Sequence, residues 1–243
     1  ALFAWLRLLR PAVELTAEPV LWVMDAIRST GPGLEAVPAS GPCLVIANHA
    51  CWLDPLFLAK LLPRPVTPMM TSRFYDLPVL RWLMLRVFHT IRVPEKALKQ
   101  DVPEEITQAV AALDRGECVV IFPEGYLRRT EDRPLRRFGR GVWQILKARP
   151  NTPVFTCWIE GGWGSYTSYR NGKPTKNKKP DFRRRIVVGM SAAVLVPADV
   201  LEEHLRTRLF LMNQVAAART LLGLPELPRF DLPEREEAEE KPD

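Results

Sequence analysis

Short apolar runs alternate with amphipathic stretches along the 243-residue chain, which predicts an α/β fold with a mainly parallel sheet flanked by helices. Runs such as residues 43–47 and 118–122 are continuously apolar, as is typical of strands buried on both faces. The stretch 102–114 between them carries its apolar residues on one helical side. Hydrophobic residues make up 47% of the chain and charged residues 26%, as in an ordinary globular protein.

The predicted elements begin with residues 1–28, one or two helices interrupted by prolines and ended by the Gly-Pro-Gly run at 31–33. Residues 77–87 are very apolar but contain two arginines, which favours a helix over the core or in a membrane interface. The predicted strands are residues 43–47, 66–70, 89–93, 118–122, 153–159 and 185–189. The other predicted helices are residues 54–62, 102–114, 141–148 and 200–221.

Three segments are expected along the chain. Residues 1–35 form an N-terminal helical region with a side suited to a membrane interface, residues 36–228 one α/β domain, and residues 229–243 a flexible acidic tail. No stretch of about 18 uninterrupted apolar residues is present, so the sequence predicts no transmembrane helix of the usual kind. Because the chain has no initiating methionine, we expect it to be part of a larger multidomain polypeptide.

The charge of the chain is unevenly distributed. Its formal net charge is +6, but the last ten residues hold six acidic and two basic side chains, which leaves +10 for the rest. This excess favours an anionic partner such as phospholipid headgroups or a phosphorylated molecule. The basic residues match no recognised nucleic-acid motif, so we expect no nucleic acid as partner. The four cysteines lack metal-site spacing, which predicts reduced thiols and no metal.

His49 and Asp54 are the first candidate catalytic residues, because a carboxylate can orient an imidazole that takes a proton from a hydroxyl. Of the three histidines, only His49 closely follows a strand-like run and has an acid five positions downstream. Asp54 is predicted to be the N-cap of a helix that Pro55 begins. On one straight helix the two side chains would lie about 140° apart, so His49 must lie in the preceding turn. Taken alone, the pair also fits a loop histidine followed by a helix cap.

A second group of candidates follows the strand at 118–122. The segment continues as Pro123-Glu124-Gly125-Tyr126-Leu127-Arg128-Arg129-Thr130. An acid, a glycine and two arginines at the end of a strand are suited to binding an oxyanion or a phosphate. A surface turn with solvated charges is the alternative interpretation.

Together the two segments resemble the glycerolipid acyltransferase family, which includes the 1-acylglycerol-3-phosphate acyltransferases. Its first motif, Asn-His-x4-Asp (often written HX4D), is matched by Asn48, His49 and Asp54. Its third motif, Phe-Pro-Glu-Gly, is matched by residues 122–125. Looser matches to the second and fourth motifs are the run ending in Arg92 and the strand opened by Pro153.

The resemblance implies transfer of a fatty acyl group from an acyl thioester to the hydroxyl of a lysophospholipid, in phospholipid biosynthesis or remodelling. His49 would be the general base and Asp54 its orienting carboxylate. Acyl-CoA or acyl-carrier protein would be the co-substrate, with no cofactor and no metal. The chain would act on the cytoplasmic face of a membrane as a peripheral or monotopic protein. The acceptor and its phosphate would be bound by Arg92, Glu124, Gly125, Arg128 and Arg129.

The residues after the third motif depart from the pattern of many family members. Many family members continue the third motif with Thr-Arg-Ser, whereas Tyr126, Leu127 and Arg128 follow here, with the arginine displaced by one position. This phasing resembles acyltransferase domains of fused multidomain proteins, some of which use lysophosphatidylethanolamine. We therefore retain that acceptor beside 1-acylglycerol-3-phosphate. Two further alternatives are a thioesterase using the same pair and a non-enzymatic module that binds anionic membranes or nucleic acid.

Overall fold

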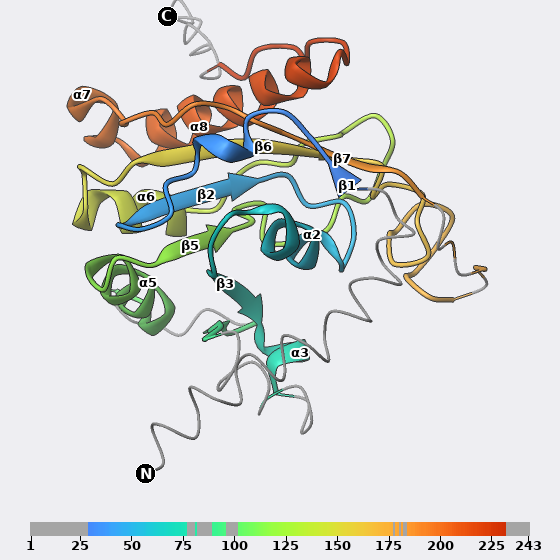
Figure 1. Cartoon of the computed structure of the whole chain (residues 1–243), viewed down its shortest axis with the longest axis horizontal. Helices are drawn as coiled ribbons and strands as arrows, with labels where there is room; N and C mark the ends of the chain where they lie inside the picture. Colours follow the sequence, from blue (N-terminus) through green and yellow to red (C-terminus); the bar gives the residue numbers. More distant parts are fainter. Residues whose placement is uncertain are drawn as a thin grey trace, which may run out of the picture.

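A single sheet forms the centre of the protein (Figure 1). The computed structural model describes residues 29–76, 81, 89–95, 102–176, 178, 179, 181 and 184–231. Within them the strands are Ser29–Thr30 (β1), Cys43–Ala47 (β2), Val66–Thr71 (β3), Ile91–Val93 (β4), Cys118–Ile121 (β5), Val154–Glu160 (β6) and Ile186–Met190 (β7). Their order across the sheet is β1-β7-β6-β2-β5-β3-β4, and all neighbours are parallel except the pair β6 and β7.

Helices pack on both faces of this sheet. The α-helices among the described residues are Asp54–Leu61 (α2), Ser72–Tyr75 (α3), Glu104–Asp114 (α5), Gly141–Ala148 (α6), Ala198–Leu201 (α7) and His204–Ala218 (α8). Two short 3-10 helices are Leu34–Ala36 (η1) and Arg219–Leu222 (η2). Successive side chains of a strand point to opposite faces, so each strand supplies two cores. One core includes residues of α5, α6 and α8, and the other includes residues of α2.

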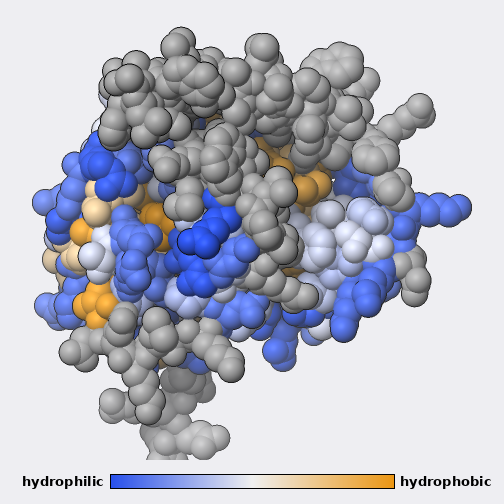
Figure 2. All heavy atoms as spheres, turned by 90° about the horizontal axis from the view of Figure 1, so that it is seen from below, coloured by the Kyte–Doolittle hydropathy of each residue, from blue (hydrophilic) through white to orange (hydrophobic). Residues whose placement is uncertain are grey.

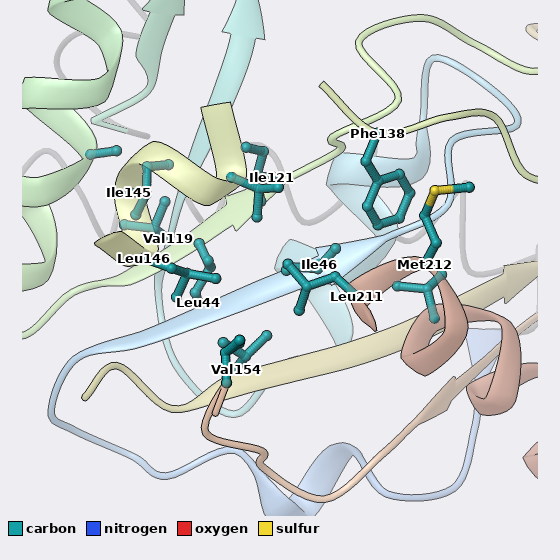
Figure 3. Packing of buried hydrophobic residues seen from close by; sticks show 14 of the residues in the cluster. Leu44, Ile46, Val119, Ile121, Phe138, Ile145, Leu146, Val154, Leu211 and Met212 are labelled. Carbon is teal, nitrogen blue, oxygen red and sulfur yellow. The ribbon is translucent and has the colours of Figure 1, made fainter. Parts of the chain in front are cut away.

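The larger core lies between the sheet and helices α6 and α8 (Figure 3). Leu44 and Ile46 of β2 meet Leu146 of α6 and Leu211 of α8 there, all of them buried. Phe138, from the loop before α6, is also fully buried in this core. The loop after β5 is therefore attached to the core at Phe138, which restricts where the residues on either side of it can lie.

The register of β2 on β5 aligns the two predicted motifs. Ile46 pairs with Ile121, an offset of 75 positions. The same offset carried past the strand ends places His49 opposite Glu124. Because parallel strands end at the same edge of the sheet, both motifs lie at one edge, where ligands of such sheets gather.

The predicted α/β class with a mainly parallel sheet is confirmed, and six of the strands agree with predicted strands within two residues. The strand at Ile91–Val93 begins later than predicted because His89 has a positive φ of 48°, which a strand does not accommodate. The antiparallel pairing of β7 follows from its connection, since residues 161–185 contain no helix among those described. A parallel crossover usually needs such a helix.

The predicted helix at 200–221 is divided into α7, α8 and η2. Glu203 has an extended backbone between the first two, and the break is held from both sides. Trp143 Nε1 donates a hydrogen bond to the carbonyl of Leu201, and Thr207 Oγ1 donates one to the carbonyl of Val200.

The ends of the described chain attach closely to the sheet domain. β1 extends the sheet beside β7, and Gly31 lies so near that an added Cβ would be 1.6 Å from the carbonyl oxygen of Val188. At the other end, Phe230 packs against the larger core and exchanges two hydrogen bonds with Asn213. The predicted helices at 1–28 and, apart from Arg81, at 77–87 lie outside the described residues, as do residues 232–243. The three predicted segment limits stay a prediction.

The described helices are all too short or too polar to cross a membrane. On the face seen in Figure 2, hydrophilic side chains dominate the surface that is not drawn grey, with smaller apolar areas between them.

Replacement of Leu146 by Ala should lower the free energy of unfolding by about 2–5 kcal/mol, because the fully buried side chain would leave a cavity between α6 and the sheet. Leu195→Ala is the matched control, since that leucine is 59% exposed, and its effect should stay within about 0.5 kcal/mol. Denaturant unfolding followed by circular dichroism measures both, and equal losses would contradict the packing described.

Candidate functional site

The turn from Asn48 to Asp54 connects β2 to α2 and is organised by one carboxylate. Asp54 is fully buried at the first position of α2. Its Oδ2 accepts hydrogen bonds from the backbone N–H groups of Ala50 (2.7 Å) and Cys51 (2.8 Å). The sequence prediction that Asp54 is the N-cap of the helix was wrong, because Leu53 occupies that position. The carboxylate accepts hydrogen bonds from residues that precede it in the chain, so the turn folds over the Asp54 side chain.

This fold brings His49 into contact with Asp54. His49 Nδ1 lies 3.0 Å from Asp54 Oδ2, and the imidazole stacks on the ring of Phe122 with 4.3 Å between centroids. A carboxylate only accepts, so we assign the imidazole proton to Nδ1, which leaves the lone pair on Nε2. His49 is 19% exposed and Asp54 is not exposed, so only the histidine can reach a ligand.

Glu124 holds the backbone of the same histidine. Its Oε1 accepts the N–H of His49 at 2.7 Å, and its Oε2 accepts the N–H of Arg136 at 2.8 Å. The side chain is 5% exposed, and this burial raises the pKa of Glu124 to about 8, against the lowering effect of the two N–H groups. The carboxylate thus connects the end of β2 to the loop before α6.

Two further contacts complete the support of His49. Its carbonyl oxygen accepts the N–H of Arg128 at 2.8 Å, so both backbone polar groups of the histidine are bound. The preceding residue, Asn48, is buried and exchanges two hydrogen bonds with the backbone of Ile159 in β6. Residues from three adjacent strand ends therefore position one imidazole.

Two residues behind Asp54 were missed by the sequence reasoning. Cys51, one of the variable positions between His49 and Asp54, donates a hydrogen bond from its thiol to Asp54 Oδ1 at 3.1 Å. Burial and the nearby carboxylate raise the pKa of this thiol well above its usual range. Gly162 closes the other side, where an added Cβ would be 3.1 Å from Asp54 Oδ1 and 3.3 Å from Cys51 Sγ. The position of Cys51 within the motif was a usable signal, whereas nothing in the sequence distinguishes Gly162.

The loop that carries Gly162 is attached to the histidine turn and is held by basic residues. Trp52 N–H donates to the carbonyl of Thr167, and Cys51 forms an isolated β-bridge with Ser168. Arg184 donates to the carbonyls of residues 161, 163 and 164, and Lys178 donates to the carbonyl of Ser168. Two of the basic residues between positions 170 and 185 therefore have a structural role beside the site.

The predicted acceptor residues after Glu124 lie beside the histidine turn. Gly125 is exposed with a φ of +69°, and its Cβ position faces open space. Arg128 places its guanidinium over the ring of Trp163 and donates to the carbonyls of residues 130 and 131. Arg129 lies over the ring of Tyr169 at 3.4 Å.

Arg92 lies apart from this group. It belongs to the edge strand β4 and forms a two-fold hydrogen-bonded ion pair with Asp76, both side chains being more than 40% exposed. The registers of β4 on β3 and of β3 on β5 place Arg92 level with Phe122, about 10 Å away across two strand spacings. Ile91 packs in the larger core, so alternation puts Arg92 on the same face as Phe122.

The chemistry of this arrangement is that of an oriented general base. Nε2 of His49 has no hydrogen-bond partner among the described residues, and a buried carboxylate is placed to stabilise the imidazolium. All four cysteines are free and buried. The described residues contain no group of three or more acidic, histidine or cysteine side chains arranged to hold a metal.

Comparison with known proteins gives three findings. A family model described as Acyltransferase matches residues 28–160. Uncharacterized proteins of Mycobacterium tuberculosis and Mycobacterium bovis are each 33% identical over 141 residues, 53% of this chain and 36% of theirs. An uncharacterized protein of Mycobacterium leprae is 30% identical over 141 residues, 53% of this chain and 35% of its own length. The match spans about a third of these curated relatives.

The third finding is a likeness of fold. The crystal structure of the 1-acyl-sn-glycerophosphate (LPA) acyltransferase PlsC from Thermotoga maritima superposes with a TM-score of 0.58 at 16% identity. The superposition covers 82% of this chain and 74% of that one.

The raised pKa of Glu124 predicts a pH-dependent stability. The pKa of Glu124 is about 8 in the folded state, against an ordinary value of 4.5 in the unfolded chain. The folded state therefore binds the proton more tightly, and the free energy of unfolding should fall as pH rises from about 4.5 to 8. The slope should approach 1.4 kcal/mol per pH unit, roughly the limit for one proton. Denaturant titrations between pH 4.5 and 9 measure it.

Glu124→Gln should remove this slope, because an amide does not titrate there. It should also cost about 1–3 kcal/mol above pH 8, since its NH₂ would face one of the two buried N–H groups. Glu202→Gln, at an exposed position, is the control that should keep the wild-type slope. An unchanged slope in the Glu124→Gln variant would rule out Glu124 as its source.

Proposed function

The chain belongs to the acyltransferase family, as its motifs predicted, and we propose that it transfers a fatty acyl group from an acyl thioester to the hydroxyl of a lysophospholipid. The favoured acceptor is 1-acylglycerol-3-phosphate. The observation that carries this proposal is the contact between His49 Nδ1 and the buried Asp54, which leaves Nε2 free at the sheet edge.

In the proposed reaction, Nε2 of His49 takes the proton of the acceptor hydroxyl while its oxygen attacks the thioester carbonyl. Asp54 stabilises the imidazolium through Nδ1. The tetrahedral intermediate collapses to the ester and a thiolate, and the imidazolium returns its proton to that thiolate. The proton count balances, and no cofactor or metal is required, because the thioester is already activated.

Direct transfer within a ternary complex is favoured over an acyl-enzyme. Cys51 is the cysteine of the motif, but it is 1% exposed, and its thiol donates a hydrogen bond to Asp54. A buried thiol with a strongly raised pKa is a poor nucleophile. This supports a role for Cys51 in orienting the carboxylate.

The acceptor is proposed to lie along the edge between β2 and β4. Glu124 shapes this region through the backbone contacts described, and the open space at Gly125 leaves room for a ligand. Arg128 and Arg129 follow the third motif and lie over Trp163 and Tyr169. Arg92 would release Asp76 and bind the phosphate instead. The donor is acyl-CoA or acyl-carrier protein.

The substrate implies action at a membrane surface, which we propose to be the cytoplasmic face. Basic residues near an anionic bilayer each contribute on the order of 1 kcal/mol to binding, and the chain has a net charge of +6. The chain is also proposed to be one part of a larger polypeptide, with phospholipid biosynthesis or remodelling as its role.

Lysophosphatidylethanolamine is the second candidate acceptor. Leu127 is buried and Tyr126 is 60% exposed, so the displaced arginine of the third motif follows an inward-facing leucine. The guanidinium of Arg128 donates to two loop carbonyls and stacks on Trp163, which leaves fewer N–H donors for a phosphate monoester. A phosphodiester headgroup carries less negative charge than a monoester and requires fewer N–H donors.

His49→Ala should lower acyl transfer by at least about 10²–10⁴-fold, because the general base is lost, without lowering the unfolding midpoint. Thiol release from palmitoyl-CoA, measured against a panel of lysophospholipids, gives the rate and the preferred acceptor. His89→Asn is the control, since that histidine is exposed and asparagine tolerates its positive φ. Retained turnover in the His49→Ala variant would refute the mechanism, and thiol release without any acceptor would indicate a thioesterase.

Gly162→Ala should lower kcat about tenfold and leave KM nearly unchanged, because its Cβ would push on Asp54 and Cys51 without contacting substrate. Gly41→Ala is the control: its φ of +90° makes the variant strained, but it lies before β2, at the opposite end of the strand from His49. If both variants lose only stability and keep kcat, Gly162 does not position the pair.

A further inference from the structure

Arg208 of α8 is an almost buried cation at the loop before α6. Its side chain is 9% exposed, and its Nε donates a hydrogen bond to the carbonyl of Phe138 at 2.5 Å. Phe138 is fully buried in the larger core, so the loop and the guanidinium fix each other's position. Burial lowers the pKa of Arg208, as expected where a charge is removed from water.

Two more arginines flank the residue that Arg208 binds. Arg137 precedes Phe138 directly, and Arg140 follows it by two positions; both are exposed. Their charges lower the pKa of Arg208 further, as expected where two like charges lie near it. None of the three has a carboxylate partner within the described parts of the chain.

Two other arginines of the same helices do have acidic partners. Arg206, two positions away on α8, pairs with Glu203, and Arg149 at the end of α6 pairs with Asp114. A buried cation close to two like charges is unfavourable unless an anion compensates it. Helix α6 also begins directly after Arg140, with no acidic residue in its first turn and no side chain capping it. The first N–H groups of a helix have no partner within that helix, so they would add to the attraction for an anion.

We propose that Arg137, Arg140 and Arg208 form a binding site for a phosphate group of a substrate. Guanidinium groups match phosphate oxygens in geometry and charge. The site is adjacent to the candidate active site along the chain, because Arg136 donates its N–H to the same Glu124 carboxylate that holds His49. The phosphate belongs either to the nucleotide end of a CoA thioester or to the acceptor headgroup. That assignment to substrates rests on the proposed function, whereas phosphate binding itself does not.

Thermal unfolding with inorganic phosphate tests the site directly. At matched ionic strength, exchanging chloride for phosphate should raise the midpoint of the wild type by about 3 °C or more. The double variant Arg137→Ala/Arg140→Ala should show no such rise, and in chloride it should be at least as stable as the wild type, because repulsion around Arg208 is relieved. Arg206→Ala should keep the full rise. No rise in the wild type, or an equal rise in the double variant, would overturn the proposal.

Calorimetric titration with CoA and with glycerol 3-phosphate separates the two sources. Neither probe carries an acyl group, so binding is measured without turnover, and its outcome is independent of whether acyl transfer occurs. The double variant should bind one of the two probes at least about tenfold more weakly, while Arg206→Ala should stay within twofold of the wild type. Loss for CoA assigns the site to the donor, and loss for glycerol 3-phosphate assigns it to the acceptor. Unchanged binding of both probes would overturn the link to substrate.

Discussion

The buried carboxylate of Asp54 is the constraint on which the candidate site depends. Four donors converge on it: the imidazole of His49, the N–H groups of Ala50 and Cys51, and the thiol of Cys51. A buried charge is tolerated only when it is satisfied in this way. The same bonds that satisfy it fold the turn after β2, so the stability of the turn and the orientation of the base have one origin. Gly162 leaves room for this arrangement.

A second buried acid, Glu124, performs a different task at the neighbouring strand end. Glu124 contacts backbone groups only, and it connects His49 to the loop that leads into α6. Asp54 thus orients the imidazole of His49, and Glu124 positions the backbone of His49. The division follows from the parallel register of β2 and β5, which places the two motifs opposite each other. Substitution of either acid is expected to disturb the same histidine by a different route.

The arginines of the described chain fall into distinct environments. Some are paired with acids, as Arg92 is with Asp76 and Arg206 with Glu203. Others lie over aromatic rings, as Arg128 and Arg129 do beside the histidine turn. The group around Arg208 has neither arrangement within the described residues and includes a buried guanidinium beside two like charges, which is why it is assigned to an external anion. The net charge of the chain does not distinguish these arginines, although their different partners give them different roles.

The sequence alone determined the fold class, most strand positions and the candidate pair of His49 and Asp54, because apolar runs and motif spacing are local properties. It also placed His49 in a turn, since two side chains five positions apart diverge on a helix. Only the tertiary structure decided which groups surround the pair. Gly162 and the backbone partners of Glu124 come from distant segments, and no local pattern encodes such contacts. The direction in which Asp54 binds and the isolation of Arg208 from acids likewise depend on how the loops pack against the sheet.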